Sequence, residues 1–517
     1  MAEPLTVGMI GYGFMGRAHA NALARLPMFF PDAPAVTRDT LVGRDESALG
    51  EAADRLGFER TATDWRDVVG DVDVLYNLAP NHLHAEPSIT ALEAGTAVLC
   101  EKPLATTREG AESMASAAAD ADVPACIGFN YRFVPAIQYA RRLIDAGEIG
   151  EITQFRGRYL QDWLVDPDAP WSWRLDDDRA GSGALGDLGA HTVDLARFLV
   201  GDRTGGIDRV SGNLRTVTTE RPVASEGDET TGDDETTSND ETASDDESTT
   251  EHRPVTVDDA FTAQLGFANG AVGTVEASRV AAGHKNDHTI EIHGTEGSLR
   301  FSLERLNELD VHTGDSRGYE TVLVTEESDP YLDHWWPPGH VLGWEHTFVH
   351  ESYEFLTSVA DSTTGESTTG STPTVPSFAD GAAVQRVLDG IERAAERRRG
   401  STSTATTTES VRHCGSCGGR NRNGFSSRRY PPQYGFEQRQ RLRDGHHRRD
   451  GRGHSRHSCR YRRLPGQRCG PIRLDGADRL HRQSNRARPP VELALRRPPT
   501  STFIPVGGLD GSNHHAS

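Results

Sequence analysis

Cysteines and long apolar runs are scarce in this chain of 517 residues. Cys100 and Cys126 are the only cysteines in residues 1–400, and both lie in apolar stretches, so we expect no disulfide framework there. No apolar run approaches the ~20 residues that cross a bilayer. The opening sequence, MAEPLTVGMIGYGFMG, lacks the basic region of a signal peptide. We therefore expect a cytoplasmic protein with no membrane partner.

Lysine is nearly absent as well. Lys102 and Lys285 are the only lysines among 55 basic residues, against 77 acidic ones. Residues 1–400 are strongly acidic, because 23 of the arginines lie in residues 401–517. Such a body is typical of halophilic, haloarchaeal-type proteins, in which salt screens the repulsion between surface carboxylates. This charge argues against nucleic acid as a partner of the body. A lysine in a chain that otherwise uses arginine as its cation suggests a role that arginine cannot fill.

Short apolar runs alternate with helical patterns through residues 4–130. This alternation predicts a parallel, doubly wound sheet of the Rossmann type. The expected strands are 5–10, 40–43, 72–79, 97–100 and 125–129.

Residues 131–400 follow a different pattern, in which apolar and polar residues alternate and Gly or Asn-Gly separates the runs. We expect a C-terminal α+β domain with a large, mostly antiparallel open sheet that is covered on one face. The expected strands are 151–160, 255–267, 271–280, 288–294 and 297–302, and the expected helices are 183–201, 343–360 and 378–399.

Three segments do not fit either domain. Residues 219–253 consist mainly of Thr, Ser, Asp and Glu, so we expect an acidic, disordered insertion. Residues 361–377 are expected to form a Ser/Thr-rich linker. Residues 401–517 are rich in Arg, Gly, Ser, His and Pro.

The basic tail, residues 401–517, has three interpretations. It could be a nucleic-acid-binding arm. It could hold zinc through Cys414 and Cys417 with Cys459, Cys469 or a histidine, although the spacing after the first pair matches no familiar zinc pattern. We favour the third, out-of-frame translation of a GC-rich gene, because the charge reverses at one boundary. We assign the tail no function and expect no nucleic-acid partner.

The motif Gly11-x-Gly13-x-x-Gly16 follows the first predicted strand and opens the first predicted helix. Glycines at these positions allow a tight turn and a close approach of pyrophosphate, and the helix N-terminus offers free N–H groups. In this position the motif predicts an NAD(P) site that includes Phe14 and Met15. The alternative is a glycine-rich turn without a ligand.

The end of the second predicted strand bears on the choice of cofactor. An acid is expected there for the ribose of NAD, but Gly43 and Arg44 occupy the place and Asp45 follows. Arg44 favours the 2′-phosphate of NADP slightly. Asp45 could still reach the ribose, or could simply cap the next helix.

Lys102 follows the apolar strand AVLC in the sequence Glu101-Lys102-Pro103. The carboxyl edge of a parallel sheet is where such sheets bind ligands. A lysine there can orient a hydroxyl or polarise a carbonyl, and Pro103 could hold a cis peptide. The alternative is a surface cation at a strand end.

Asp187 and His191 lie four residues apart in a predicted helix, so they share a face that Asp194 continues one turn further. A histidine beside a carboxylate can serve as a general acid or base. The alternative is an ordinary helical pair or a helix cap.

Taken together, these motifs resemble those of the Gfo/Idh/MocA oxidoreductases, the family of glucose-fructose oxidoreductase and inositol dehydrogenase. The resemblance covers most of residues 5–400 and is carried by GMIGYGFMGRAHA, APNHLHAEPSITALEAGTAVLCEKPLA, GFNYRFVPAI, GSGALGDLGAHTVDLARFLVG and PSFADGAAVQRVLDGI.

The resemblance implies a role for each matched position. Lys102, Asp187 and His191 would be catalytic. Pro80, Asn81, His84 and Glu101 would join Lys102 in the cofactor site, and Tyr131 and Arg132 would join the catalytic residues in the substrate site. It implies sugar or polyol oxidation coupled to NAD(P) reduction, no metal, and a homo-oligomer, either a dimer or a tetramer, assembled through the open sheet.

Aromatic segments supply further substrate-site candidates. Aromatic faces suit the C–H surfaces of sugars, and polar tips suit their hydroxyls. Packing in the core is the alternative for each of them. The candidates are Trp163, Trp173 and His340, with Trp335, Trp336 and His346 in the same segments.

The sequence therefore predicts an NAD(P)-dependent dehydrogenase acting on the CH–OH group of a sugar or polyol. The rival is a nucleotide-binding sensor on the same fold that performs no turnover. The physiological sugar, the position oxidised and the reaction direction stay open.

Overall fold

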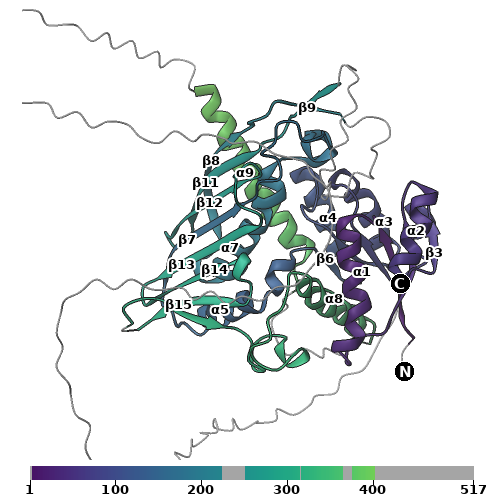
Figure 1. Cartoon of the computed structure of the whole chain (residues 1–517), viewed down its shortest axis with the longest axis horizontal. Helices are drawn as coiled ribbons and strands as arrows, with labels where there is room; N and C mark the ends of the chain where they lie inside the picture. The colour runs from purple at the N-terminus through teal and green to yellow at the C-terminus, as the bar shows by residue number, and fades with distance from the viewer. Residues whose placement is uncertain (1–2, 224–250, 315, 365–374, 402–517) are drawn as a thin grey trace, which may run out of the picture. The chain divides into compact units, whose positions relative to one another are not determined.

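The apolar runs of the N-terminal third form six parallel strands, as in the computed structural model of Figure 1. Their spatial order is β3-β2-β1-β4-β5-β6. The order reverses between β1 and β4, and a crevice for a ligand opens at the carboxyl ends of strands at such a point. The strands are β1 (Leu5–Ile10), β2 (Val36–Val42), β3 (Arg60–Ala62), β4 (Val74–Asn77), β5 (Ala97–Cys100) and β6 (Ala125–Ile127).

The structure describes residues 3–223, 251–314, 316–364 and 375–401. The helices of the first domain are α1 (Phe14–Phe29), α2 (Glu46–Leu56), α3 (Ala85–Glu93) and α4 (Arg108–Asp120). Single turns of helix are η1 (Trp65–Asp67), η2 (Asn81–Leu83), η3 (Asn130–Phe133), η4 (Trp173–Leu175), η6 (Leu303–Arg305) and η7 (Leu332–His334).

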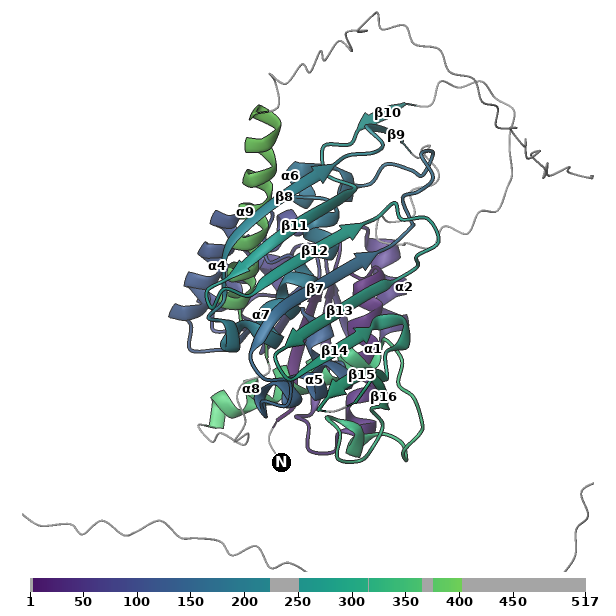
Figure 2. The same cartoon turned by 90° about the vertical axis from the view of Figure 1, so that its left-hand side faces the viewer.

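A second sheet of eight strands forms the other domain, and Figure 2 shows these strands side by side. Their order is β16-β15-β14-β13-β7-β12-β11-β8, and among the described strands of this second sheet only β7 and β12 pair in parallel. They are β7 (Ile152–Leu160), β8 (Ile207–Arg215), β11 (Ala260–Phe267), β12 (Val272–Ser278), β13 (Asp287–Gly294), β14 (Gly297–Ser302), β15 (Glu308–Thr313) and β16 (Glu320–Leu323).

One face of the second sheet is covered by helices, and these lie behind the strands in Figure 2. Buried and exposed residues alternate along β12 because only one face meets the core. Gly157 of β7 leaves room for α7, since a Cβ there would lie 2.1 Å from Thr192 Cγ2. The covering helices include α5 (Pro135–Asp145), the wide π turn η5 (Leu185–Gly189) and α7 (Ala190–Thr204), with the short α6 (Asp177–Ala180) nearby.

The last two helices tie the second domain back to the first. Helix α8 (His346–Thr364) packs against α1, and α9 (Phe378–Ser401) packs against α4 and β8. The backbone N–H of Ile127 in β6 donates to Pro376 O at 2.9 Å. The two sheets are therefore held together at the edge formed by β6.

The predicted fold class is confirmed, with three local corrections. The ends of the acidic insertion 219–253 pair as strands, β9 (Glu220–Pro222) and β10 (His252–Pro254). This pairing is held because buried Arg221 donates to the carbonyls of Leu164 and Asp166. Residues 361–364 continue α8 instead of beginning a linker. Strands β3, β8, β15 and β16 were not predicted.

The predictions for residues 224–250, 365–374 and 402–517 lie outside the described residues. Across the part of the chain that the structure describes, no helix is long and apolar enough to span a bilayer.

Candidate active site

A cleft of about 340 Å³ lies between the two domains at the carboxyl ends of the parallel strands. Both domains contribute to its lining. Thirteen of the residues predicted for the site line it: Gly13, Phe14, Met15, Gly16, Pro80, Asn81, His84, Glu101, Lys102, Tyr131, Trp173, Asp187 and His191.

The first wall of the cleft is the glycine turn between β1 and α1. Gly11 lies just behind the lining with φ of 96°, and a Cβ there would lie 2.8 Å from Leu78 O. A Cβ on Gly16 would lie 2.5 Å from Gly11 O, so the turn closes only without side chains. Gly13 caps α1 with no side-chain hydrogen bond, which leaves the first N–H groups of the helix to a ligand. These features fit the pyrophosphate of a dinucleotide.

Lys102 projects from the end of β5 into the cleft, and the Lys102–Pro103 peptide is cis, which the sequence had left as a possibility. Its Nζ donates to Asp187 Oδ1 at 3.0 Å and to Asp187 O at 2.9 Å. Burial by itself would lower the pKa of Lys102, but the carboxylates of Asp187 and Glu101 raise it above its usual value. The ammonium is therefore charged and joins the two domains.

Asp187 and His191 reach the cleft from the π turn η5 and the first turn of α7. Burial would raise the pKa of Asp187, but Lys102, Arg279 and Arg174 lower it. Burial and the nearby Lys102 hold the pKa of His191 well below its ordinary value. The pair thus consists of a charged carboxylate and a neutral imidazole.

Glu101 supports Lys102 from inside the first domain. Its Oε2 accepts the backbone N–H of Lys102 at 3.0 Å, and its Oε1 lies 3.1 Å from Nε2 of buried His19 on α1. Burial would raise the pKa of Glu101, but His19 and Lys102 lower it. A charged carboxylate at this position fixes the backbone that carries the lysine.

The segment after β4 forms the wall beside the glycine turn. His84 is buried, with its ring nitrogens 2.8 Å from Pro103 O and 2.8 Å from Ala79 O. Asn81 Nδ2 donates to Ala180 O at 2.9 Å, across to the second domain. Both residues line the cleft, and their bonds to protein carbonyls fix the shape of this wall.

Comparison with known proteins agrees with this geometry. Residues 5–129 match a model described as an oxidoreductase family with an NAD-binding Rossmann fold, and residues 137–300 match a GFO/IDH/MocA C-terminal domain. The chain belongs to the GFO/IDH/MocA oxidoreductase family. The predicted family and the predicted Rossmann fold of an NAD-binding type are both confirmed.

Three relatives show the range of this family. Levoglucosan dehydrogenase of Pseudarthrobacter phenanthrenivorans is 43% identical over 76% of this chain and 97% of its own. Scyllo-inositol 2-dehydrogenase (NAD(+)) of Bacillus subtilis is 29% identical over 62% and 81%. D-xylose 1-dehydrogenase [NADP(+)] of Haloarcula marismortui is 33% identical over 38% and 55%.

Solved structures agree as well. A levoglucosan dehydrogenase in complex with NADH superposes with a TM-score of 0.67 at 41% identity, covering 76% of this chain and 98% of its own. An oxidoreductase domain protein from Kribbella flavida gives a TM-score of 0.68 at 44% identity, covering 77% and 98%.

Several of the predicted site residues of this family member lie elsewhere. Arg132 is buried away from the cleft lining, and its Nε donates to Asp194 Oδ2 at 2.9 Å, so the two charges satisfy each other. Asp194 is buried with Arg132 and does not line the cleft with Asp187 and His191. Trp163 packs beside Leu164 and Leu175 outside the cleft, and exposed His340 has its Nδ1 near Pro337 O.

The cofactor-selecting residues also lie outside the cleft lining. Asp45 caps α2, because its Oδ1 accepts the N–H groups of Ser47 and Ala48. The charge of Arg44 reaches His82, because burial, Arg179 and Arg44 together lower the pKa of His82. His82 follows Asn81, which lines the cleft.

Other cleft residues were missed by sequence reasoning. Single polar residues at strand ends and in loops form no motif, so the pattern gave no signal for them. Lys285 was noticed only for its rarity, and the chain's two lysines turn out to line the same cleft. The missed residues include Gln161, Arg174, Ser182, Arg279, Lys285, Asn286 and Trp344.

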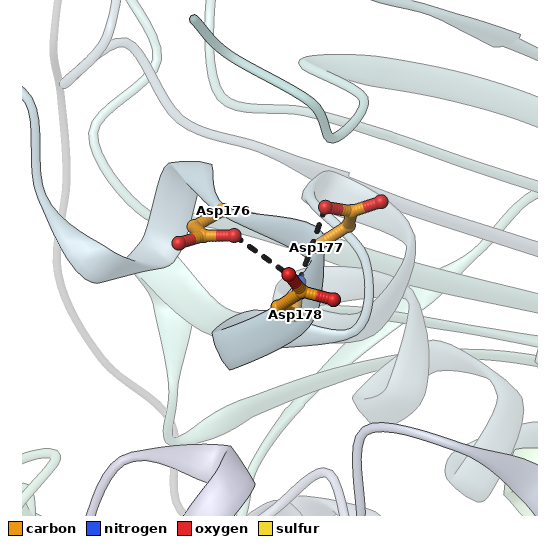
Figure 3. Close-up of side chains that lie close together, drawn as sticks. All are labelled: Asp176, Asp177 and Asp178. Atoms are coloured by element: carbon orange, nitrogen blue, oxygen red, sulfur yellow. Dashed lines mark hydrogen bonds between the residues drawn. The ribbon is translucent and has the colours of Figure 1, made fainter. Parts of the chain in front are cut away.

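Among the described residues, one cluster of carboxylates has the spacing of a metal site: Asp176, Asp177 and Asp178, shown in Figure 3. Asp176 Oδ1 accepts the N–H of Asp178, and Asp177 Oδ1 accepts the hydroxyl of Thr256. Asp176 caps the short helix α6, and Asp177 and Asp178 lie in its first turn, so we assign them no metal.

Proposed function

We propose that this protein is an NAD(P)-dependent dehydrogenase that oxidises a secondary hydroxyl of a sugar or polyol. The observation that supports this best is the meeting of Lys102, Asp187 and His191 in one cleft beside the glycine turn. Both domains are needed to build that constellation, and a sensor that only binds a nucleotide needs none of it.

His191 is the proposed base. Its Nδ1 is buried, so Nε2 is the atom that takes the hydroxyl proton. Because the low pKa keeps the imidazole neutral, it is ready to accept that proton at neutral pH. The Lys102 ammonium donates to the hydroxyl oxygen and orients it, while Asp187 holds the ammonium in place. A bound nicotinamide supplies the hydride acceptor.

We propose that the cofactor pyrophosphate lies against Gly11, Gly13, Phe14, Met15 and Gly16. Pro80, Asn81, His84, Glu101 and Lys102 would complete that site. We propose that Arg44 donates hydrogen bonds to a 2′-phosphate, with Arg179 and His82 in the same region, which gives NADP a modest advantage over NAD. A levoglucosan dehydrogenase binds NADH, and a D-xylose dehydrogenase relative is named for NADP, so both remain to be tested.

The substrate class follows from the cleft and from the relatives. Trp173 and Tyr131 offer aromatic surface, and the lining supplies several amide and hydroxyl groups. Levoglucosan and inositol dehydrogenases lead us to propose a cyclic polyol or an anhydrosugar.

We also propose that the enzyme forms a dimer or tetramer through the open face of its second sheet, and that it acts in the cytoplasm. That face carries a groove of about 760 Å³ whose lining includes Arg156, Glu276, Glu291 and Arg300. Charges of both signs on a broad, open sheet suit a self-complementary contact.

The test is nicotinamide reduction by the full chain in concentrated KCl, with NAD⁺ and NADP⁺ assayed separately. The panel holds inositols, aldoses and anhydrosugars. Turnover that disappears in Lys102→Ala and persists in Arg66→Ala, an exposed cation of the same domain, supports the dehydrogenase. Cofactor binding without turnover of any sugar favours the sensor. Failure of the folded protein to bind either cofactor contradicts both.

A further inference from the structure

We infer that Asn286 and Gln161 recognise, by hydrogen bonding, a substrate hydroxyl that is not the one oxidised. We also infer that ion pairs on both sides of Asn286 set the position of the Asn286 side chain. The inference rests on the proposed function, because it concerns how the same cleft selects among sugars. Neither residue belongs to the catalytic set.

A ring contact followed by hydrogen bonds connects the proposed catalytic histidine, His191, to this pair. The Tyr131 ring lies 4.6 Å from the His191 ring, and the Tyr131 hydroxyl is 2.8 Å from that of Tyr159. The Tyr159 hydroxyl donates to Asn286 Oδ1 at 2.7 Å. Gln161 Nε2 donates to the same Oδ1 at 2.9 Å. The pair thus lies two tyrosine rings away from the proposed base.

The bonding fixes which atoms meet a ligand. Asn286 Oδ1 already accepts two hydrogen bonds, and the Asn286 side chain also hydrogen-bonds Tyr131. The amide nitrogen Nδ2 carries two hydrogens, so a donor is still left for a ligand. Gln161 uses Nε2 in that contact, so its remaining group is the acceptor Oε1. Both side chains line the cleft. A donor beside an acceptor matches a hydroxyl, which both gives and takes a hydrogen bond.

The backbone around Asn286 is anchored on both sides. On one side, Lys285 Nζ donates to Asp162 Oδ2 at 2.9 Å and to Oδ1 at 3.1 Å. On the other, Asp287 Oδ2 accepts from Arg158 at 3.0 Å and lies 2.8 Å from His284 Nδ1.

The loop itself is pinned to the end of β7. Gly283 N–H donates to Asp162 Oδ2 at 3.1 Å, and Ala281 N–H donates to Gln161 O at 2.9 Å. The same short segment, 161–162, therefore holds the loop and supplies Gln161. Lys285, exposed on the loop, acts as a positioning residue through Asn286.

The experiment compares the best wild-type substrate with its monodeoxy analogues, in the wild type and in Asn286→Ala. In the wild type, one analogue, deoxygenated away from the oxidised carbon, should lose about tenfold in kcat/KM. In Asn286→Ala the parent sugar should fall to the level of that analogue, so the ratio between them approaches one. Asn21→Ala, at an exposed asparagine of α1, should keep the wild-type ratio.

Lys285 is tested by the same ratio. Lys285→Met should reduce the discrimination at least threefold, mainly through KM, and Lys285→Arg should restore most of it, because a guanidinium can still reach Asp162.

The outcomes separate this inference from the proposed function. If the wild type turns over sugars but Asn286→Ala keeps the full analogue ratio, the inference is wrong and the dehydrogenase stands. An equal loss on every substrate shows that Asn286 only supports the fold, which also overturns it. If the wild type oxidises no sugar, both fall.

Discussion

At the scale of single residues, the contacts of Lys102 explain why one of the two lysines in the chain lies at the end of a strand. Its Nζ meets both the backbone oxygen and the carboxylate of Asp187 from one point. An ammonium is a compact donor with three hydrogens, whereas a guanidinium is a wide planar fork. The site therefore depends on the shape of the cation and not only on its charge.

Lys102→Arg tests this directly. We expect kcat to fall by about 100-fold or more, because the fork cannot meet Asp187 and a substrate oxygen together. Cofactor affinity should fall less than kcat, because the glycine turn proposed to hold the pyrophosphate is unchanged. The measurement is steady-state kinetics with cofactor binding by nicotinamide fluorescence. Wild-type kcat in Lys102→Arg would contradict the proposed orienting role.

Arg44 gives a second prediction at this scale. In Arg44→Ala we expect the KM for NADP to rise about tenfold, because a charge-assisted contact to the 2′-phosphate is lost. The KM for NAD should stay within about twofold, since NAD lacks that phosphate. Initial rates with each cofactor at saturating sugar provide the check. Equal effects on both cofactors would remove the preference for NADP.

At the scale of elements, the turn before η5 decides where Asp187 lies. A Cβ on Gly183 would lie 1.7 Å from Asp258 O, so this turn approaches the neighbouring backbone closely. Leu185 N–H donates to Asp258 Oδ2 at 3.0 Å, which holds the start of the π turn. The position of Asp187 is thus set by contacts several residues away.

A pair of glycine substitutions tests that control. Gly183→Ala should cut kcat/KM at least tenfold and lower the melting temperature, because the turn must move away from Asp258. Gly50→Ala lies in α2, where a Cβ meets nothing within 4 Å, and should stabilise the protein by about 0.5–1 kcal/mol. Thermal unfolding and kinetics on both variants settle the point. Full activity in Gly183→Ala would show that Asp187 is placed by other contacts.

Elements also show how far the sequence can be read. The Rossmann strands and the site motifs were predictable because strand–helix alternation and the glycine turn are local signals. Arg132 was misplaced because its charge gave no indication that Asp194 lies beside it in the fold. Asn286 and Gln161 were missed because their meeting depends on pairing between distant strands. Strand β8 was missed by sequence reasoning because buried and exposed residues do not alternate clearly along it.

At the scale of the whole molecule, buried neutral histidines connect stability to pH. Burial lowers the pKa of His288 and of His350 to about 3 each. His350 is satisfied as a neutral ring, since Trp335 Nε1 donates to its Nε2 at 2.7 Å and its Nδ1 is 2.9 Å from Phe133 O. The unfolded chain binds these protons near pH 6.5, whereas the folded protein does not.

Stability contributed by these histidines is therefore present above about pH 6.5 and lost as the pH falls toward about 3. We expect each histidine to lower the free energy of unfolding by about 1.4 kcal/mol for each pH unit of acidification within that window. Denaturant unfolding at pH 7, 6 and 5 in constant KCl measures the slope, and His350→Gln should reduce it. A flat profile would contradict the buried neutral rings.

The tail is the other question at this scale. A chain that stops after Ser401 should keep wild-type kcat and KM, because the cleft lies wholly within residues 13–348. Kinetics of the shortened and full chains side by side provide the check. A loss of turnover with the fold intact would give residues 402–517 a function.

The contact between Lys102 and Asp187 has one more consequence. Lys102 comes from the Rossmann domain and Asp187 from the C-terminal domain. Without the C-terminal domain, the Lys102 ammonium would lose its contact with Asp187. Selection on catalysis therefore acts on the pair of domains as one heritable unit. A chimaera that joins the Rossmann domain of one relative to the C-terminal domain of another should be active only if the residues that meet around the Lys102–Asp187 contact come from the same relative.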